Sequence, residues 1–234
     1  MKGKLYLFPS TLGESDLHYI LPQYNITHIA DVKHFIVEDL RTARRFLKKC
    51  SNEIVIDDLQ FYLLNKHTSK EEIFNYLKPL KEGHNVGLIS EAGCPAIADP
   101  GADVVSLAQE ADIQVIPLVG PSSILLAMMA SGFNGQSFAF NGYLPIDLKE
   151  KKDVLRKLEA RIFNEKQTQV FIETPYRNMK TLNELIQLGS PVLKLCIATD
   201  ITLSTEFIKT RYLKDWTKNQ PDLNKRPTIF ILYQ

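Results

Sequence analysis

Residues 90–101 read S-E-A-G-C-P-A-I-A-D-P-G and follow a short apolar run, Val86–Ile89. Small residues and turn formers dominate this stretch, which carries only two carboxylates. Open α/β sheets bind ligands in loops at the carboxyl ends of their strands, where small side chains let the backbone approach the ligand closely. A plain structural turn before a helix explains the same residues. The stretch by itself leaves these two interpretations even.

On both sides of this stretch, short β-rich runs alternate with segments of helical periodicity, which predicts an α/β fold. A charge-free segment, 114–146, is interrupted by prolines and glycines, so it is too broken for a membrane span. We interpret it as buried interior and domain junction, which predicts two α/β domains, 1–118 and 119–234. Strands are expected at 5–8, 53–57, 85–89, 114–118, 138–141, 169–173, 193–198, 205–210 and 228–233, and helices at 36–49, 70–81, 102–111, 122–131, 148–163 and 178–188.

The bulk composition excludes several classes of protein. The chain has 234 residues and a formal charge of +1, so no global field draws it to nucleic acid or to a membrane. Its three cysteines are far apart in the sequence and give neither a disulfide framework nor the spacing of metal ligands. We therefore expect a cytoplasmic protein without a structural metal.

Three further segments carry candidate chemistry. Gly120–Ser123 offers hydroxyls and backbone N–H groups at a helix start, which suits an anion or ordinary capping. Glu38 and Asp39 lie near the start of the helix predicted at 36–49, just before a basic stripe, which suits an RNA backbone but is more often a solvated face. Glu173 ends a strand and can serve as a base, hydrogen-bond a ligand amine, or simply pair with Arg177. The basic residues of the stripe are Arg41, Arg44, Arg45, Lys48 and Lys49.

Taken together, these segments resemble the tetrapyrrole (corrin/porphyrin) methylase family of class III S-adenosylmethionine (SAM) methyltransferases. Within the family they are most similar to the branch that methylates a cytidine ribose 2′-hydroxyl in bacterial small-subunit ribosomal RNA. Residues 90–101 resemble that branch's S-D-A-G-x-P-x-x-x-D-P-G, and 120–122 its G-P-S. Residues 38–41, E-D-L-R, resemble E-D-T-R, and 171–177 resemble F-x-E-A-P-H-R. The motifs occur in order over nearly the whole chain, which makes the resemblance specific.

The resemblance implies two α/β domains with SAM bound in the cleft between them, and a homodimer. It also implies a set of cofactor contacts and a set of acceptor-side residues. The implied cofactor contacts are Leu12, Gly13, Ser90, Glu91, Ala92, Gly93, Ser122, Ser123, Glu173, Tyr176, Pro227 and Thr228. The residues that we place on the acceptor side, as catalytic candidates, are Glu38, Asp39, Arg41 and His67.

The chain departs from the branch mainly on the acceptor side. Residues 10–14 are S-T-L-G-E in place of T-P-I-G-N, and Leu64–Thr68 replaces Y-H-E-H-N, so that only His67 remains. We therefore expect a SAM-dependent methyltransferase that acts on a ribose hydroxyl of ribosomal RNA. Two alternatives stay open: methylation of a tetrapyrrole or another small molecule, and a SAM-binding relative without acceptor chemistry.

Overall fold

The computed structural model describes residues 2–234. The chain divides between Ser122 and Ser123 into two compact units, unit 1 and unit 2. The sequence prediction divided the chain after residue 118. Unit 1 contains β1 (Leu5–Phe8), α1 (Leu17–Ile20), α2 (Gln23–His28), β2 (His34–Val37), α3 (Leu40–Cys50), β3 (Gln60–Leu63), α4 (Lys70–Tyr76), α5 (Lys78–Lys81), β4 (Val86–Ile89), α6 (Gly101–Glu110) and β5 (Val115–Pro117). Unit 2 contains α7 (Ser123–Ser131), β6 (Phe138–Tyr143), α8 (Leu148–Glu165), β7 (Thr168–Ile172), α9 (Asn178–Leu188), β8 (Lys194–Thr199), β9 (Phe207–Tyr212) and β10 (Thr228–Tyr233), with short 3₁₀ turns in both units.

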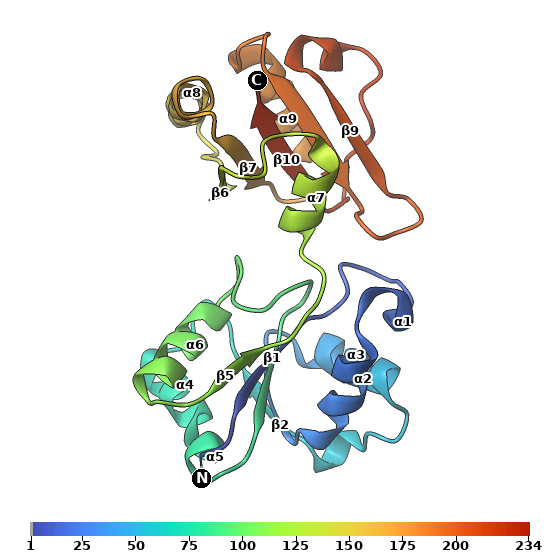
Figure 1. Cartoon of the computed structure of the whole chain (residues 1–234), viewed down its shortest axis with the longest axis vertical. Helices are drawn as coiled ribbons and strands as arrows, with labels where there is room; N and C mark the ends of the chain where they lie inside the picture. Colours follow the sequence, from blue (N-terminus) through green and yellow to red (C-terminus); the bar gives the residue numbers. More distant parts are fainter. Residues whose placement is uncertain (1) are drawn as a thin grey trace. The chain divides into compact units, whose positions relative to one another are not determined.

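The sheet of unit 1 is parallel, in the order β3-β2-β4-β1-β5. Figure 1 labels β1, β2 and β5 of this sheet. The three inner strands, β1, β2 and β4, are short and largely buried on both faces, which is typical of continuous apolar runs in parallel sheets. Tyr6, Phe8 and Phe35 point to the face that packs against α1, α2 and α3. Leu5 and Ile36 point to the opposite face, which α4, α5 and α6 cover. The sheet is therefore sandwiched between two helical layers.

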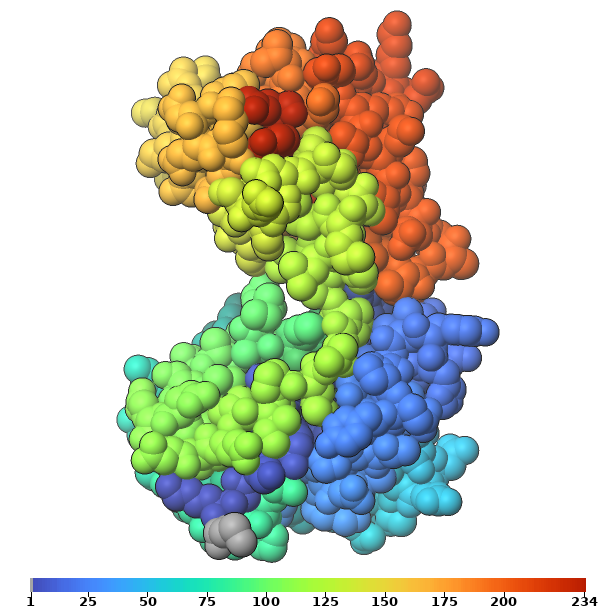
Figure 2. Space-filling view, in the orientation of Figure 1, coloured from blue at the N-terminus to red at the C-terminus, as the bar shows by residue number. Residues whose placement is uncertain are grey.

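The sheet of unit 2 is mixed, in the order β6-β7-β10-β8-β9, and only the β6–β7 pair is parallel. Helices α8 and α9 and the 3₁₀ turn that carries Trp216 enclose a core around Phe171 and Phe230, whose rings are stacked. Helix α7 contacts β9 and β10, and in the space-filling view its yellow-green atoms lie in front of the sheet (Figure 2). The α/β fold predicted from the sequence is confirmed.

Several predicted elements were wrong in detail. Ile36 and Val37 belong to β2 and not to the following helix, because they are β-branched and buried while Asp39 caps α3. Residues 53–57 form no strand; β3 begins at Gln60, after a 3₁₀ turn. The segment predicted as one helix at 70–81 is divided into α4 and α5 at Leu77. Within residues 2–234, no helix has both the length and the apolar composition that a membrane crossing requires.

Gly120 lies where the loop after β5 meets the loop after β1. A Cβ built on Gly120 would lie 2.2 Å from the Cβ of Pro9, which is far inside van der Waals contact. We expect Gly120→Ala to force these loops apart and to lower the free energy of unfolding by about 2–3 kcal/mol, as overpacking does. Chemical denaturation measures the loss. Gly135→Ala is the control, since a Cβ at Gly135 meets nothing within 4 Å; equal losses in both variants contradict the account.

Candidate functional site

Parallel pairing collects the loops of unit 1 at one edge of its sheet. The carboxyl ends of β1, β2 and β4 are in register, with Phe8 and Val37 both paired with Ile89. The residues that follow these strands therefore meet there. The loop after β1 carries Leu12 and Gly13, and the loop after β4 carries 90–101. This is the edge at which open α/β sheets bind ligands.

The 90–101 loop is held in one conformation by internal bonds. The Ser90 hydroxyl donates to the carbonyl of Gly93 (2.8 Å), which also accepts from the backbone N–H of Ser10 (3.0 Å). Asp99 Oδ1 accepts from the N–H groups of Ala96 (2.8 Å) and Gly101 (2.9 Å). Ala96 and Ala98 are left-handed, at φ 64° and 63°, a conformation that costs a non-glycine residue energy.

The same loop lies against the loops after β1 and β5. Gly93, at φ 80°, has no room for a side chain to expand, since a Cβ would sit 3.1 Å from Leu12 Cδ2 and 3.2 Å from the carbonyl of Pro121. The Cys94 thiol donates to that same carbonyl (3.3 Å). The loops after β1, β4 and β5 are thus tied to one another.

Three carboxylates, Glu38, Glu91 and Asp99, lie near this edge. No Lys or Arg is among the groups that shift their pKa values. Burial raises the pKa of Glu38, and the nearby charges of Asp99 and Glu91 raise it further, against one hydrogen bond from the Glu91 N–H. Burial and the charge of Asp39 raise the pKa of Glu91. Burial also raises the pKa of Asp99, although two N–H groups oppose it. Such a cluster attracts a cationic ligand.

Asp39 and Arg41 belong to the start of α3. Asp39 is the N-cap residue, and its carboxylate accepts from the N–H of Thr42 (2.8 Å), a bond that lowers the pKa of Asp39. Arg41 is exposed two residues further on. His67 is also exposed, in the loop after β3, where its backbone N–H donates to Asn65 Oδ1 (2.8 Å). The structure brings Glu38, Asp39 and Glu91 together, whereas His67 stands in a separate loop.

A pocket of about 200 Å³ opens at this edge of unit 1. Its walls come from the loop after β1, the ends of β2 and β4, and one side of α3. It includes four of the predicted cofactor residues and none of the four predicted catalytic ones. The lining residues are Ser10, Thr11, Leu12, Gly13, Glu14, Val37, Thr42, Ala43, Arg45, Phe46, Lys49, Ile89, Ser90 and Glu91.

In unit 2, the Glu173 carboxylate is occupied by its own neighbours. Its Oε1 accepts from the Thr174 N–H (2.7 Å) and the Arg177 Nε (2.9 Å), and its Oε2 from the Thr181 hydroxyl (3.0 Å). Burial raises the pKa of Glu173, but these donors outweigh it and lower the pKa overall. The pairing with Arg177 that the sequence left open is present. The next-but-two residue, Tyr176, is 77% exposed.

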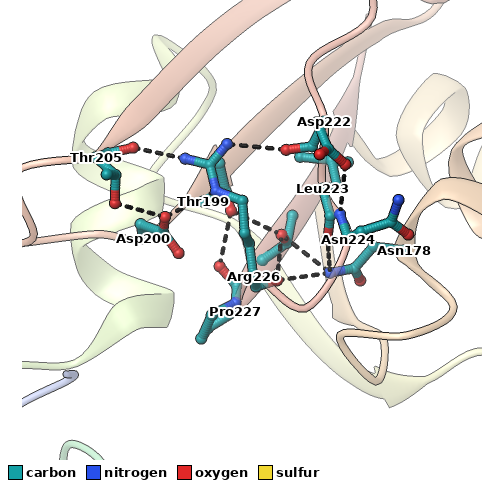
Figure 3. Close-up of polar contacts among 10 residues, drawn as sticks. Asn178, Thr199, Asp200, Thr205, Asp222, Leu223, Asn224, Arg226 and Pro227 are labelled. Atoms are coloured by element: carbon teal, nitrogen blue, oxygen red, sulfur yellow. Dashed lines mark hydrogen bonds and ion pairs between the residues drawn. The ribbon is translucent and has the colours of Figure 1, made fainter.

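A second polar cluster in unit 2, which the sequence did not predict, fixes the approach to β10 (Figure 3). Arg226 donates from Nε to Asp200 Oδ2 (2.7 Å) and from Nη2 to the carbonyl of Thr205 (2.6 Å), while the Thr205 hydroxyl donates to Asp200 Oδ2 (2.7 Å). Asp200 has a left-handed backbone, at φ 51°. One guanidinium therefore ties the loop between β8 and β9 to the approach to β10.

The cluster continues to the predicted cofactor residue Thr228. Its hydroxyl lies 3.0 Å from the hydroxyl of Thr199 and 3.1 Å from Nδ2 of Asn178, which also donates to the carbonyl of Arg226 (2.7 Å; Figure 3). Asn178 is fully buried, and its Oδ1 has no hydrogen-bond partner. Pro227 is exposed. The Thr228 hydroxyl is thus used in hydrogen bonds within unit 2. A single Asn or Thr in the sequence does not predict such a network.

The predicted cofactor residues are divided between the units. Ser122 ends unit 1 and Ser123 begins α7 of unit 2. Ala92 is exposed in the loop after β4. Among residues 2–234, no three His, Cys, Asp or Glu side chains are grouped so that they could hold a metal ion.

The chain is similar in sequence and in fold to known methyltransferases. The chain is 33% identical over 175 residues to the ribosomal RNA small subunit methyltransferase I of Haemophilus influenzae, a match of 74% of this chain and 60% of that protein. It is 29% identical over 233 residues to the protein of the same name from Buchnera aphidicola subsp. Schizaphis graminum, covering 95% of this chain and 80% of that one. The solved methyltransferase CobJ superposes with a TM-score of 0.66 at 15% identity, covering 99% and 94% of the two chains. The chain belongs to the family of the ribosomal RNA small subunit methyltransferase I proteins.

Other comparisons agree on the fold. A uroporphyrin-III C-methyltransferase from Thermus thermophilus, solved in complex with S-adenosylhomocysteine, gives a TM-score of 0.58 at 16% identity, covering 99% of this chain and 98% of that one. At such identities the likeness concerns the fold alone. No family model matches the chain. The match to the Haemophilus protein spans less than two thirds of that protein's length.

The Arg226 cluster gives a prediction for unit 2. Arg226→Ala leaves Asp200, whose side chain is 7% exposed, without its cation. We expect the free energy of unfolding to fall by about 2–3 kcal/mol, somewhat less than for a fully buried pair because Arg226 keeps some contact with water. Chemical denaturation measures it.

The matched control is Arg156→Ala. Arg156 pairs with Asp153 at 3.7 Å on the exposed surface of α8, where an ion pair contributes less than about 1 kcal/mol. If Arg226→Ala costs no more than this control, the cluster does not hold the start of β10.

Proposed function

We propose that the chain is a SAM-dependent methyltransferase that methylates a ribose 2′-hydroxyl in ribosomal RNA of the small subunit. The names of its sequence relatives carry the methyltransferase class and the RNA substrate. The S-adenosylhomocysteine in the structural neighbour supports the cofactor, because that molecule is what remains of SAM after methyl transfer. The single observation that carries the proposal is the set of uncompensated carboxylates, Glu38, Glu91 and Asp99, at the ligand-binding edge of unit 1.

The residues of this edge fit SAM. The cofactor is cationic at its sulfonium and its amino group, and both charges are favoured beside carboxylates that lack a cation. Gly93 leaves no room for a side chain, so the 90–101 loop packs closely against the loops after β1 and β5 at this edge. When bound, SAM supplies an electrophilic methyl group on sulfur.

Glu38 is the base that we assign to the reaction. Transfer forms a bond between the ribose 2′-oxygen and the methyl carbon while the carbon–sulfur bond breaks, and the hydroxyl proton must leave. A glutamate with a raised pKa accepts that proton more readily than an ordinary one. Asp39 orders the start of α3 as its cap, and Arg41 remains a proposed acceptor-side contact. His67 is also proposed as an acceptor-side residue, and none of its contacts supports that role.

The basic side of α3 favours RNA over a tetrapyrrole as the acceptor. Five Lys and Arg residues lie in its 11 residues, and it has no acidic residue in its first turn. Such a helix attracts a phosphate backbone. We also propose a cytoplasmic homodimer. Exposed apolar side chains in and beside the charge-free segment, Val119 (76%), Met129 (79%) and Ile146 (63%), support an interface with a second copy.

The proposal is tested by mapping ribose methylation in small-subunit ribosomal RNA. A strain without this gene should lack one 2′-O-methyl mark on a cytidine, and the gene carried on a plasmid should restore it. The purified chain with SAM should add the same mark to RNA from the deletion strain. An unchanged methylation map in the deletion strain rejects the ribosomal target.

Glu38→Gln separates chemistry from cofactor binding. We expect kcat to fall by about 10²–10⁴-fold while the KM for SAM changes little, because general-base catalysis contributes about that much. The wild-type rate should fall as pH drops through the raised pKa of Glu38, so its acid limb lies above the range of an ordinary glutamate. The variant should lose this limb.

The same variant should be more stable at neutral pH. A raised pKa in the folded state means that ionised Glu38 destabilises the fold above that pKa, so removing the charge should raise the melting temperature by about 1–3 °C. Glu71→Gln, at an exposed position of α4, is the charge control and should alter neither kcat nor the melting temperature. A full kcat in Glu38→Gln contradicts the role as base.

A further inference from the structure

The pocket of unit 1 has two unlike walls. One wall contains Ser90 and Glu91 of the loop that we assign to the cofactor, and the other is the side of α3 that carries Thr42, Arg45 and Lys49. A molecule in this pocket lies against the cofactor loop. That is the position a methyl acceptor must take.

The pocket contains a polar atom that nothing in the protein satisfies. Ser10 is only 5% exposed, and its Oγ has no hydrogen-bond partner. Its backbone N–H is used by Gly93, so the residue is fixed in place. A buried hydroxyl without a partner is costly, and it gains a bond when a ligand with a polar edge enters.

The charges of α3 are divided between its two sides. Arg45 and Lys49 line the pocket, one helical turn apart. Arg44 instead lies over the ring of Phe61, 5.4 Å from its centroid. Arg45 has one weak partner, Glu14, at 3.4 Å, and both side chains are exposed (61% and 85%). Water screens such a pair, so a phosphate can displace Glu14.

We propose that this pocket holds one unstacked nucleoside of the RNA substrate, with Ser10 Oγ bonded to the base or ribose and Arg45 and Lys49 on the adjoining phosphates. The assignment rests on the proposed function. The apolar side of the pocket includes Phe46 and Val37, which suits the face of a base. Its volume of about 200 Å³ is below the roughly 300 Å³ at which pockets for whole ligands begin, so it suits one unit of a longer chain.

Three variants of the full-length chain test the pocket, with methyl transfer to RNA from the deletion strain as the assay. Ser10→Ala should raise the KM for RNA by about 5-fold, the value of one hydrogen bond, and should fold normally because it removes no internal bond. Arg45→Ala should raise that KM by about 10-fold and reduce the salt dependence of RNA binding by about 0.7 in log–log slope. Thr42→Trp, at an exposed position, should block the pocket and abolish transfer. In Ser10→Ala and Arg45→Ala, the dissociation constant of SAM by calorimetry should stay within about 2-fold.

The matched control is Arg44→Ala, which removes the same charge from the same helix away from the pocket. It should change the KM for RNA much less than Arg45→Ala. Equal effects of these two variants, or an unchanged KM in Ser10→Ala and Arg45→Ala, overturn the pocket assignment. A weaker SAM affinity at a normal KM for RNA also overturns it and gives the pocket to the cofactor. If the unaltered chain transfers no methyl group to RNA, the proposed function itself is overturned. This outcome is distinct from the others because it needs no variant.

Discussion

The parallel pairing of β1 with both β4 and β5 is the constraint on which the site depends. Leu5 pairs with Val86 on one side and with Val115 on the other. Since all three strands run the same way, the loops that follow them leave from one edge. The bonds from Ser10 to Gly93 and from Cys94 to Pro121 then tie those loops together. A strand reversal anywhere in this trio would scatter the residues that we assign to the cofactor.

The carboxylates of the two units have opposite effects on folding. In unit 2, Glu173 and Asp200 each have a guanidinium and further donors, so these carboxylates stabilise the fold. In unit 1, Glu38 and Glu91 are shifted by burial and by other acids, so their ionised forms oppose folding. Electrostatics that oppose folding persist where a ligand supplies the missing charge. This contrast separates scaffold from site within one chain.

The sequence predicted the alternation of elements well where apolar periodicity was strong. The helix 178–188 and the strand 228–233 match the structure in full. It predicted poorly where short segments depend on tertiary contacts: helices α1 and α2 were missed, and Ile36 and Val37 were given to a helix although the sheet buries them. Local pattern carries no information on which strand a segment will pair with.

The site was predicted unevenly for a related reason. Motifs contiguous in sequence, such as 38–41 and 90–101, gave Glu38 and Glu91, which the structure brings together. The Arg226 cluster joins residues from three separate segments, and no spacing in the sequence relates Asn178 to Asp200 or Thr205 to Arg226. Arg45 and Lys49 were read as part of one basic stripe, and only the pocket separates them from Arg44.

The two left-handed alanines of the 90–101 loop bear on how quickly this protein can engage a ligand. Alanine resists that conformation far more than glycine does, so Ala96 and Ala98 limit the shapes open to the loop, and Asp99 selects one of them through two N–H bonds. The loop is thereby ordered during folding, before any ligand arrives. Binding of a ligand to this loop then resembles the docking of two rigid shapes more than coupled folding and binding. The loop loses little conformational entropy when the ligand binds.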